Sequence, residues 1–329
     1  MATTTVIENS AAKQKSKIDL RVYLAFAAIY VLWGSTYLAI RIAVQQVPPL
    51  FAAGTRFFLA GTLLYAVMRL CGRPRPVGKE WGSLLSIGSL MFVVTYGAVF
   101  WAEQYVPSGF TSVLEATLPL ITIALEVFIF RQQRFRWSLL VSIVVGFLGV
   151  LLLLLRNPQH VAILPCAAIL VGGTAWSLGA VLTRSLLLPK SKGITAGAEM
   201  MFGGAILLVL SALTGEMHPF PHVSAKALLA LGYLVVAGSF LGFSAFVWLL
   251  GRMPATRVAS HAYINPVVAV ALGYFFAGEL VTPRMLFGTA LIVASVALIL
   301  IKDKADEPEP SAELHLPGKE EAQGLKVSA

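Results

Sequence analysis

Several ionisable and hydroxyl side chains lie inside apolar stretches, and one group of them recurs at helical spacing. Thr111, Ser112, Glu115, Thr122 and Glu126 fall on one face of a helix, since about 3.6 residues make one turn. An isolated carboxylate in an apolar helix is costly unless it meets a cation, a proton or water. We therefore expect Glu115 to border a polar cavity, and the hydroxyls either to join it or to bond one another or neighbouring backbone. For Glu126, at the end of the stretch, we expect an interfacial ion pair.

A second polar group directly precedes a proline. Ser260, His261, Tyr263 and Asn265 come just before Pro266. Proline lacks an amide hydrogen, so it removes one backbone hydrogen bond and frees a carbonyl of the preceding turn. We predict a helix break here, with a plain kink as the alternative. Histidine is the side chain whose ordinary pKa lies closest to neutral pH, so His261 is a candidate for proton coupling, as is Glu115; the alternative for His261 is a packing role.

Aromatic side chains of the same apolar stretches are candidates for the walls of a cavity. We predict that a small molecule is bound by Trp33, Tyr37, Tyr96, Trp101, Glu115, Trp176, His261 and Asn265. Arg56 and Glu199 are two further charges inside apolar stretches. They either pair with each other or bind the two ends of a zwitterion, and Arg56 has the further option of reaching the interface.

Membrane-spanning helices must position all of these residues. Hydrophobic residues make up 57% of the chain and charged residues only 12%. A helix needs about 20 apolar residues to cross the hydrocarbon core. Because no stretch alternates in the manner of a membrane barrel, we predict an all-α integral membrane protein. Its ten transmembrane helices are expected at 22–43, 50–70, 83–103, 108–130, 137–155, 161–183, 195–214, 226–249, 255–277 and 284–301.

The net charge of +9 follows the expected membrane topology. Apart from Arg156, Lys226 and Arg284, the basic residues outside the spans fall in one set of alternating segments. Cytoplasmic loops retain Lys and Arg, so we expect both termini in the cytoplasm. This distribution accounts for the basic character without any nucleic-acid partner. The polar tail that follows the last span is expected to be disordered.

The second half of the chain repeats the first. Trp33 aligns with Trp176, Arg41 with Arg184, and Pro119 with Pro266. Each half holds five predicted spans, and an odd number forces the second copy to enter the membrane in the opposite orientation. Inverted repeats of this kind are typical of transporters that work by alternating access, and interrupted spans at matching positions point to their binding sites. Pro119 and Pro266 are therefore the predicted helix breaks.

Enzyme and channel signatures are absent from the sequence. There is no nucleophile elbow and no metal motif, and both Gly-Lys pairs are followed by Glu, so no phosphate-binding loop exists. Cys71 and Cys166 are isolated from each other, which excludes a disulfide framework. We predict no catalytic residues, no cofactor and no metal. A channel-like or structural membrane subunit stays open as the alternative, although neither a filter-like loop nor a ring of charge is present.

Short motifs resemble those of the EamA family of the drug/metabolite transporter superfamily, most closely its YedA-like bacterial branch. They are "LWGSTYLAIR" at 32–41, "RFFLAG" at 56–61, "INP" at 264–266, "GEL" at 278–280 and "GTALIVASVAL" at 288–298. The resemblance implies a bacterial inner-membrane carrier that exports amino acids, related metabolites or drug-like amphiphiles from a site between the halves. The first half has "FRQQ" where the second has "GE", so we expect Glu279 to act within its loop.

The predicted organisation is a cytoplasmic tail (1–21), a first repeat (22–155), a second repeat (161–301) and a disordered cytoplasmic tail (302–329). The expected partners are a small-molecule substrate and the lipid bilayer. The stripe of small residues Ala269, Gly273 and Ala277 permits close helix contact. It is compatible with a monomer or a homodimer.

Overall fold

The computed structural model describes residues 20–132, 135–154, 162–216, 222–250, 252, 258 and 261–305. The expected tails lie outside the described residues, except for residues 20 and 21, which begin the first helix, and residues 302–305, which continue the last. The elements in chain order are α1 (Leu20–Val44), α2 (Pro49–Leu70), α3 (Glu80–Gly88), η1 (Ser89–Val94), α4 (Thr95–Ala102), α5 (Ser108–Glu115), α6 (Leu118–Ala124), η2 (Leu125–Ile129), α7 (Trp137–Leu154), α8 (Ile163–Leu182), α9 (Lys192–Leu213), α10 (Ala225–Tyr233), η3 (Leu234–Leu241), α11 (Gly242–Leu250), α13 (His261–Ala277) and α14 (Pro283–Ala305). The η elements are π-helical.

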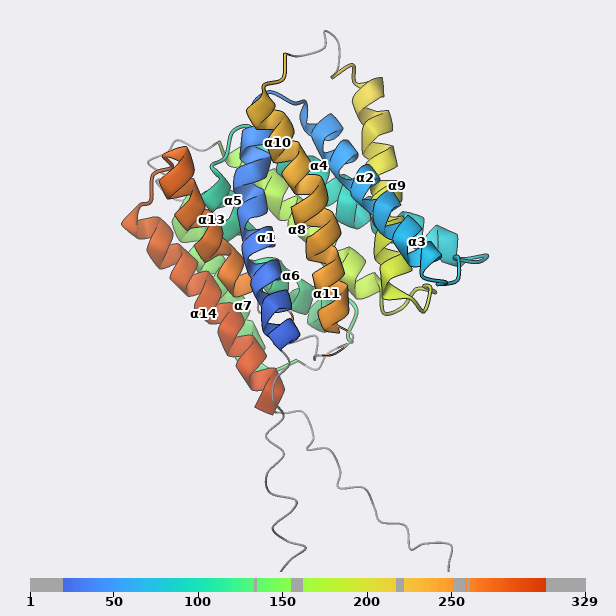
Figure 1. Cartoon of the computed structure of the whole chain (residues 1–329). Helices are drawn as coiled ribbons and strands as arrows, with labels where there is room; N and C mark the ends of the chain where they lie inside the picture. The colour runs from blue at the N-terminus through green and yellow to red at the C-terminus, as the bar shows by residue number, and fades with distance from the viewer. Residues whose placement is uncertain are drawn as a thin grey trace, which may run out of the picture.

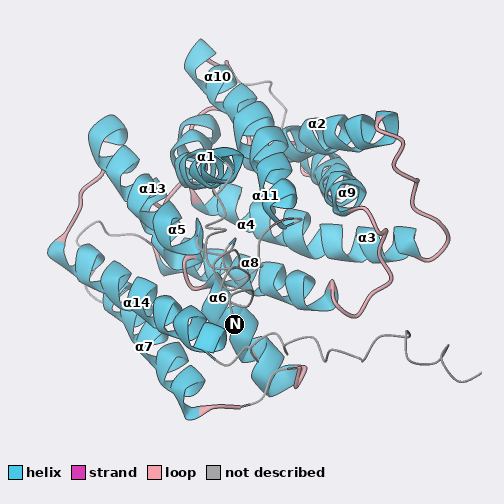
Figure 2. Ribbon diagram, turned by 60° about the horizontal axis from the view of Figure 1, so that its bottom comes forward, coloured by secondary structure: helices cyan, strands magenta, loops and turns pink. Residues whose placement is uncertain are grey.

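The described residues form helices and no strands, which confirms the all-helical prediction (Figures 1 and 2). Within them, seven helical segments are long and apolar enough to cross a membrane: α1, α2, α3 to α4, α5 to η2, α8, α9 and α10 to α11. Three shorter apolar helices, Leu139–Leu152, Ile264–Ala277 and Pro283–Ser295, lie where the remaining spans are predicted.

The two halves of the chain pack through matching pairs of helices. Helix α2 lies against α9, its counterpart in the second half, and α7 lies against α14, also its counterpart (Figures 1 and 2). The contact of α1 with α13 is mirrored by the contacts of α8 with α5 and α6. Likewise α1 packs on η3 and α11, while α8 packs on η1 and α4. The repeat seen in the sequence is thus also present in the packing.

The crossing of α2 and α9 depends on glycines from both halves. A Cβ on Gly61 would lie 2.8 Å from the carbonyl oxygen of Gly197, and one on Gly204 would lie 2.7 Å from Cα of Phe58. Both neighbours are backbone and cannot rotate away. Without a hydrophobic effect between helices in lipid, such close backbone approach is a main source of helix association.

The third span of each half contains a π-helical segment, η1 in the first and η3 in the second. Segments of this kind are uncommon and are often found near functional sites. Here they lead into α4, which carries Tyr96, and α11, which carries Phe243.

The sequence predicts that Glu279 acts within its own loop, but Glu279 caps the start of α5 in the first repeat. Its Oε1 accepts hydrogen bonds from the amide and the hydroxyl of Ser108, both at 2.7 Å, and its Oε2 accepts one from the amide of Gly109 at 2.9 Å. The first amides of a helix have no partner within it, and a carboxylate also complements the positive end of the helix dipole. The loop after α13 therefore fixes the helix that leads to Glu115.

We expect Glu279→Ala to lower the free energy of unfolding by about 1.5–3 kcal/mol, since three bonds to a charged acceptor are lost. The melting temperature of the purified protein in detergent is the measurement. Glu80→Ala is the matched control, because Glu80 accepts a single bond, from the Val77 amide at an exposed loop. Equal melting temperatures for the two variants would contradict the capping role.

Candidate functional site

A cavity of about 530 Å³ lies between the two halves of the bundle. The first half contributes residues from α1, α2, α4 and the α5 to η2 span, and the second half from α8, α11 and α13. Its lining is Trp33, Thr36, Tyr37, Ile40, Arg56, Thr95, Tyr96, Val99, Ser112, Glu115, Ala116, Leu118, Pro119, Thr122, Ile123, Glu126, Gln132, Trp176, Arg184, Phe243, His261, Ala262, Asn265 and Pro266. Among the side chains that the structure describes, none from α7 or α14 belongs to this lining, and these two helices pack together on the outside of the bundle (Figure 2).

Two tryptophans at matching positions of the halves, Trp33 and Trp176, both border the cavity. The indole nitrogen of Trp33 donates to the carbonyl of Gly238 at 3.0 Å, and its ring packs edge-on against Phe243 with centroids 5.3 Å apart. Trp176 packs edge-on against Tyr96 at 6.0 Å. These contacts fix the indoles and build a wall suited to the apolar part of a ligand.

Glu115 is held by Tyr37 across the cavity wall. The hydroxyl of Tyr37 on α1 donates to Oε2 of Glu115 on α5 at 2.7 Å. Helix α5 ends at Glu115, and a turn at residues 116–117 separates it from α6. The carboxylate therefore lies at an interruption of the fourth span, where backbone groups leave the regular helical pattern.

The two prolines differ in their local structure. Pro119 stands at the start of α6, directly after the interruption. Pro266 lies inside α13, which continues through it, so the predicted break at Pro266 is not seen. The physical reason is its position: it is the sixth residue of α13, so it removes only the bond to the carbonyl of Ala262, in the first turn. Pro266 cannot donate a hydrogen bond to the carbonyl of Ala262, and Pro119 cannot donate one to the carbonyl of Glu115. Both Ala262 and Glu115 border the cavity.

Three further polar residues border the cavity close to the aromatic wall. Nδ1 of His261 lies 2.9 Å from the carbonyl oxygen of Val258, and its ring packs edge-on against Trp33 at 4.8 Å. Asn265 is 8% exposed, and its Oδ1 has no hydrogen-bond partner among the described residues. Arg56 is the third and lies on α2; the sequence predicted that it pairs with Glu199, binds one end of a zwitterion or reaches the interface.

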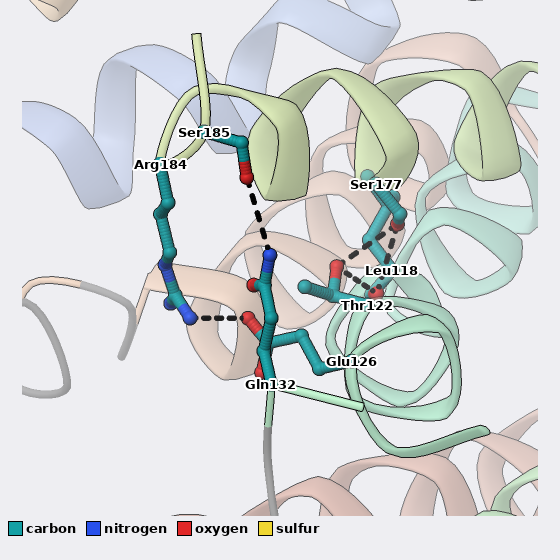
Figure 3. A network of polar contacts seen from close by, with 7 residues as sticks. All are labelled: Leu118, Thr122, Glu126, Gln132, Ser177, Arg184 and Ser185. Atoms are coloured by element: carbon teal, nitrogen blue, oxygen red, sulfur yellow. Dashed lines mark hydrogen bonds and ion pairs between the residues drawn. The ribbon is translucent and has the colours of Figure 1, made fainter. Parts of the chain in front are cut away.

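One end of the cavity is bounded by a polar network that joins the halves (Figure 3). Deeper in the bundle, Thr122 on α6 donates to the hydroxyl of Ser177 on α8 at 2.9 Å. Nearer the surface, Arg184 forms an ion pair with Glu126 at 2.7 Å. The side chain of Arg184 is 65% exposed and that of Glu126 only 9%. This end of the cavity therefore reaches the surface where α8 ends.

We expect Arg184→Glu to lower the free energy of unfolding by about 1 kcal/mol. A partly exposed ion pair contributes at most about 1 kcal/mol, and the introduced carboxylate would also lie beside that of Glu126. In a Glu126→Gln background the same change should have little effect. Melting temperatures of the single and double variants in detergent measure the difference. An equal loss in both backgrounds would show that the pair contributes nothing.

Some candidates lie away from the cavity. Trp101 is not part of the lining; its ring packs edge-on against Tyr105 at 5.6 Å and against the buried cluster around Cys166. Thr111 is fully buried outside the lining. Glu199, the counterpart of Arg56, is buried in α9 away from the lining, and no hydrogen bond or ion pair described for either residue joins the two.

The sequence proposed Arg56 as a possible ligand for one end of a zwitterion, and Arg56 borders the cavity. Three other lining residues were singled out only by their spacing. Ser112, Thr122 and Glu126 belong to the stripe spaced for one helix face, and all three border the cavity. Nothing in the sequence pointed to Gln132 as a lining residue, since it lies in the polar loop between η2 and α7.

Two homologous helical repeats around a shared cavity are the architecture of membrane transporters. The model of the EamA-like transporter family matches residues 20–155 and again residues 163–301, and the chain belongs to this family.

Named relatives fit this assignment. The uncharacterized inner membrane transporter YedA of Escherichia coli (strain K12) is 37% identical over 291 residues, which cover 86% of this chain and 91% of that protein. The probable amino-acid metabolite efflux pump of the same strain is 25% identical over 82% of this chain and 91% of that protein. A solved crystal structure with 19% sequence identity has a TM-score of 0.58, covers 87% of this chain and 99% of that chain, and shows the shared fold.

Proposed function

We propose that the protein is a secondary transporter of the inner membrane that exports amino acids, related metabolites or drug-like amphiphiles. The observation that carries this proposal is the central cavity, which is lined by both repeats. Its aromatic wall and its few buried polar groups suit a small amphiphilic molecule. The names of the relatives, an inner membrane transporter and a probable amino-acid metabolite efflux pump, support the same class of protein.

The proposed topology has ten transmembrane helices, five in each repeat, with both termini in the cytoplasm. Seven long and three shorter apolar helices among the described residues are compatible with that number. The mirrored helix pairs support a pseudo-two-fold relation between the repeats. The concentration of Lys and Arg in one set of loops supports the orientation.

The proposed mechanism is a rocking of the repeats about the cavity. At one end, Arg184 and Glu126 join the repeats at the surface. At the opposite end, Ile40 and Val99 border the cavity and belong to a buried apolar cluster that also contains Phe100. Opening that side requires this cluster to separate while the contacts of α6 with α8 tighten. Glu115 and His261 are the candidates for proton coupling.

Counterflow in proteoliposomes tests the function. Vesicles containing the purified protein are loaded with a mixed pool of amino acids, metabolites and amphiphilic drugs, and each labelled compound is then scanned for accelerated exchange. Exchange of one chemical class is the expected result. Flux that does not accelerate with internal substrate would favour a channel, and no flux of any compound with folded protein would refute transport of these classes.

A further inference from the structure

Arg56 is a buried cation that borders the cavity with unused hydrogen-bonding capacity. It is 2% exposed, and its Nε donates to the hydroxyl of Ser239 at 2.8 Å. Its Nη1 has no partner among the described residues. The guanidinium lies 4.7 Å from the ring centre of Phe57 and 5.3 Å from that of Tyr96. These rings stabilise a cation through their faces, but they offer no acceptor for the remaining N–H groups.

Glu115 supplies the opposite charge to the same cavity. One of its oxygens accepts the bond from Tyr37, and none of the ion pairs described joins it to Arg56. Asn265 adds a carbonyl oxygen that is buried and has no partner among the described residues. The cavity thus offers a donor-rich cationic group and a separate acceptor-rich anionic group, with the aromatic wall of Trp33 and Trp176 bordering the same space.

Burying separated charges is costly unless each is paired. A bound molecule with both a carboxylate and an ammonium would pair both groups, whereas a cation alone would leave Arg56 without a counter-charge. Recognition of this kind rejects analogues that lack one group, because the site then keeps an unpaired buried polar group.

We propose that the substrate is a zwitterion with an apolar side chain, whose carboxylate binds Arg56 and whose ammonium binds Glu115 and Asn265. This inference rests on the proposed transport function and narrows its substrate to amino-acid-like molecules. It makes Arg56 a specificity-determining residue and excludes cationic amphiphiles without a carboxylate.

The first experiment leaves the protein unchanged and alters the ligand. The twenty amino acids and a set of cationic amphiphiles are screened by counterflow in proteoliposomes. Each amino acid that exchanges is then compared, as a competitor, with its carboxamide and its N-acetyl derivative. We expect both derivatives to compete at least tenfold more weakly than the parent. A carboxamide that competes as well as its parent would overturn the assignment of Arg56. Exchange of cationic amphiphiles but of no amino acid would overturn the inference while transport itself stands, and no exchange at all would refute transport.

The second experiment measures how protein variants discriminate between an amino acid and its two derivatives. Arg56→Gln should remove the preference for the amino acid over its carboxamide, and Glu115→Gln the preference over its N-acetyl derivative. Arg69→Gln is the matched control, an exposed arginine on the same helix, and should behave as the unmodified protein. A folded Arg56→Gln variant that still discriminates against the carboxamide would refute the proposal; if that variant does not fold, the comparison of derivatives on the unmodified protein decides.

Discussion

Replacing Glu115 by Gln should lower counterflow at limiting substrate concentration by about 10–100-fold. The change keeps the shape of the side chain but removes a charge that borders the cavity. A hydrogen bond to a charged group contributes about 1.5–3 kcal/mol, and about 1.4 kcal/mol corresponds to a factor of ten. The measurement is the initial rate of exchange in proteoliposomes as a function of substrate concentration.

Tyr37→Phe and Glu80→Gln complete this experiment. Tyr37→Phe removes the hydroxyl that holds the carboxylate but leaves its charge, so we expect a loss of only about tenfold or less. Glu80→Gln changes the same chemical group at the start of α3, outside the cavity lining, and should leave exchange unchanged. Normal transport by Glu115→Gln would show that the Glu115 carboxylate does not contribute to substrate binding. An unchanged pH dependence of its residual transport would refute the proton-coupling role.

Replacing Gly204 by Leu should destabilise the protein by about 3 kcal/mol, at the upper end of the range for overpacking. The new Cβ would lie 2.7 Å from Cα of Phe58 and 2.8 Å from the carbonyl carbon of Phe57, so α2 and α9 would have to move apart. These helices form the contact between matching elements of the two repeats. We expect a lower melting temperature and a smaller monodisperse fraction after heating in detergent.

Gly232→Leu is the control for this change. Gly232 lies in α10, and a Cβ there would meet no atom within 4 Å. Any general cost of adding a leucine to an apolar helix appears in this variant as well. Equal melting temperatures for the two variants would show that the close approach of α2 and α9 is unimportant for stability.

The helical segments were predictable from the sequence, because crossing a membrane requires long apolar runs in which every backbone group is bonded internally. The two repeats were visible through Trp33 and Trp176, and through Pro119 and Pro266, since tryptophan and proline are scarce within spans. The stripe containing Ser112, Glu115 and Thr122 was also predictable, because helical spacing alone places these residues on one face.

The orientation of each helix toward the cavity was decided only by the tertiary structure. Arg56 and Glu199 occupy matching positions, yet only Arg56 borders the cavity. Trp33 borders it and Trp101 does not, although both are tryptophans within apolar spans. The partner of Glu126, Arg184, comes from the other repeat.

The physical reason lies in the membrane. In a soluble helix the apolar face identifies the core, but in lipid both the outer surface and the packed interior accept apolar side chains, so periodicity does not say which face turns inward. The rotation of a span is set by its contacts with neighbouring spans. The sequence by itself therefore determined the apolar helical segments, the repeat and the polar stripe of the fourth span. The packing of one repeat against the other decided which side chains meet at the cavity.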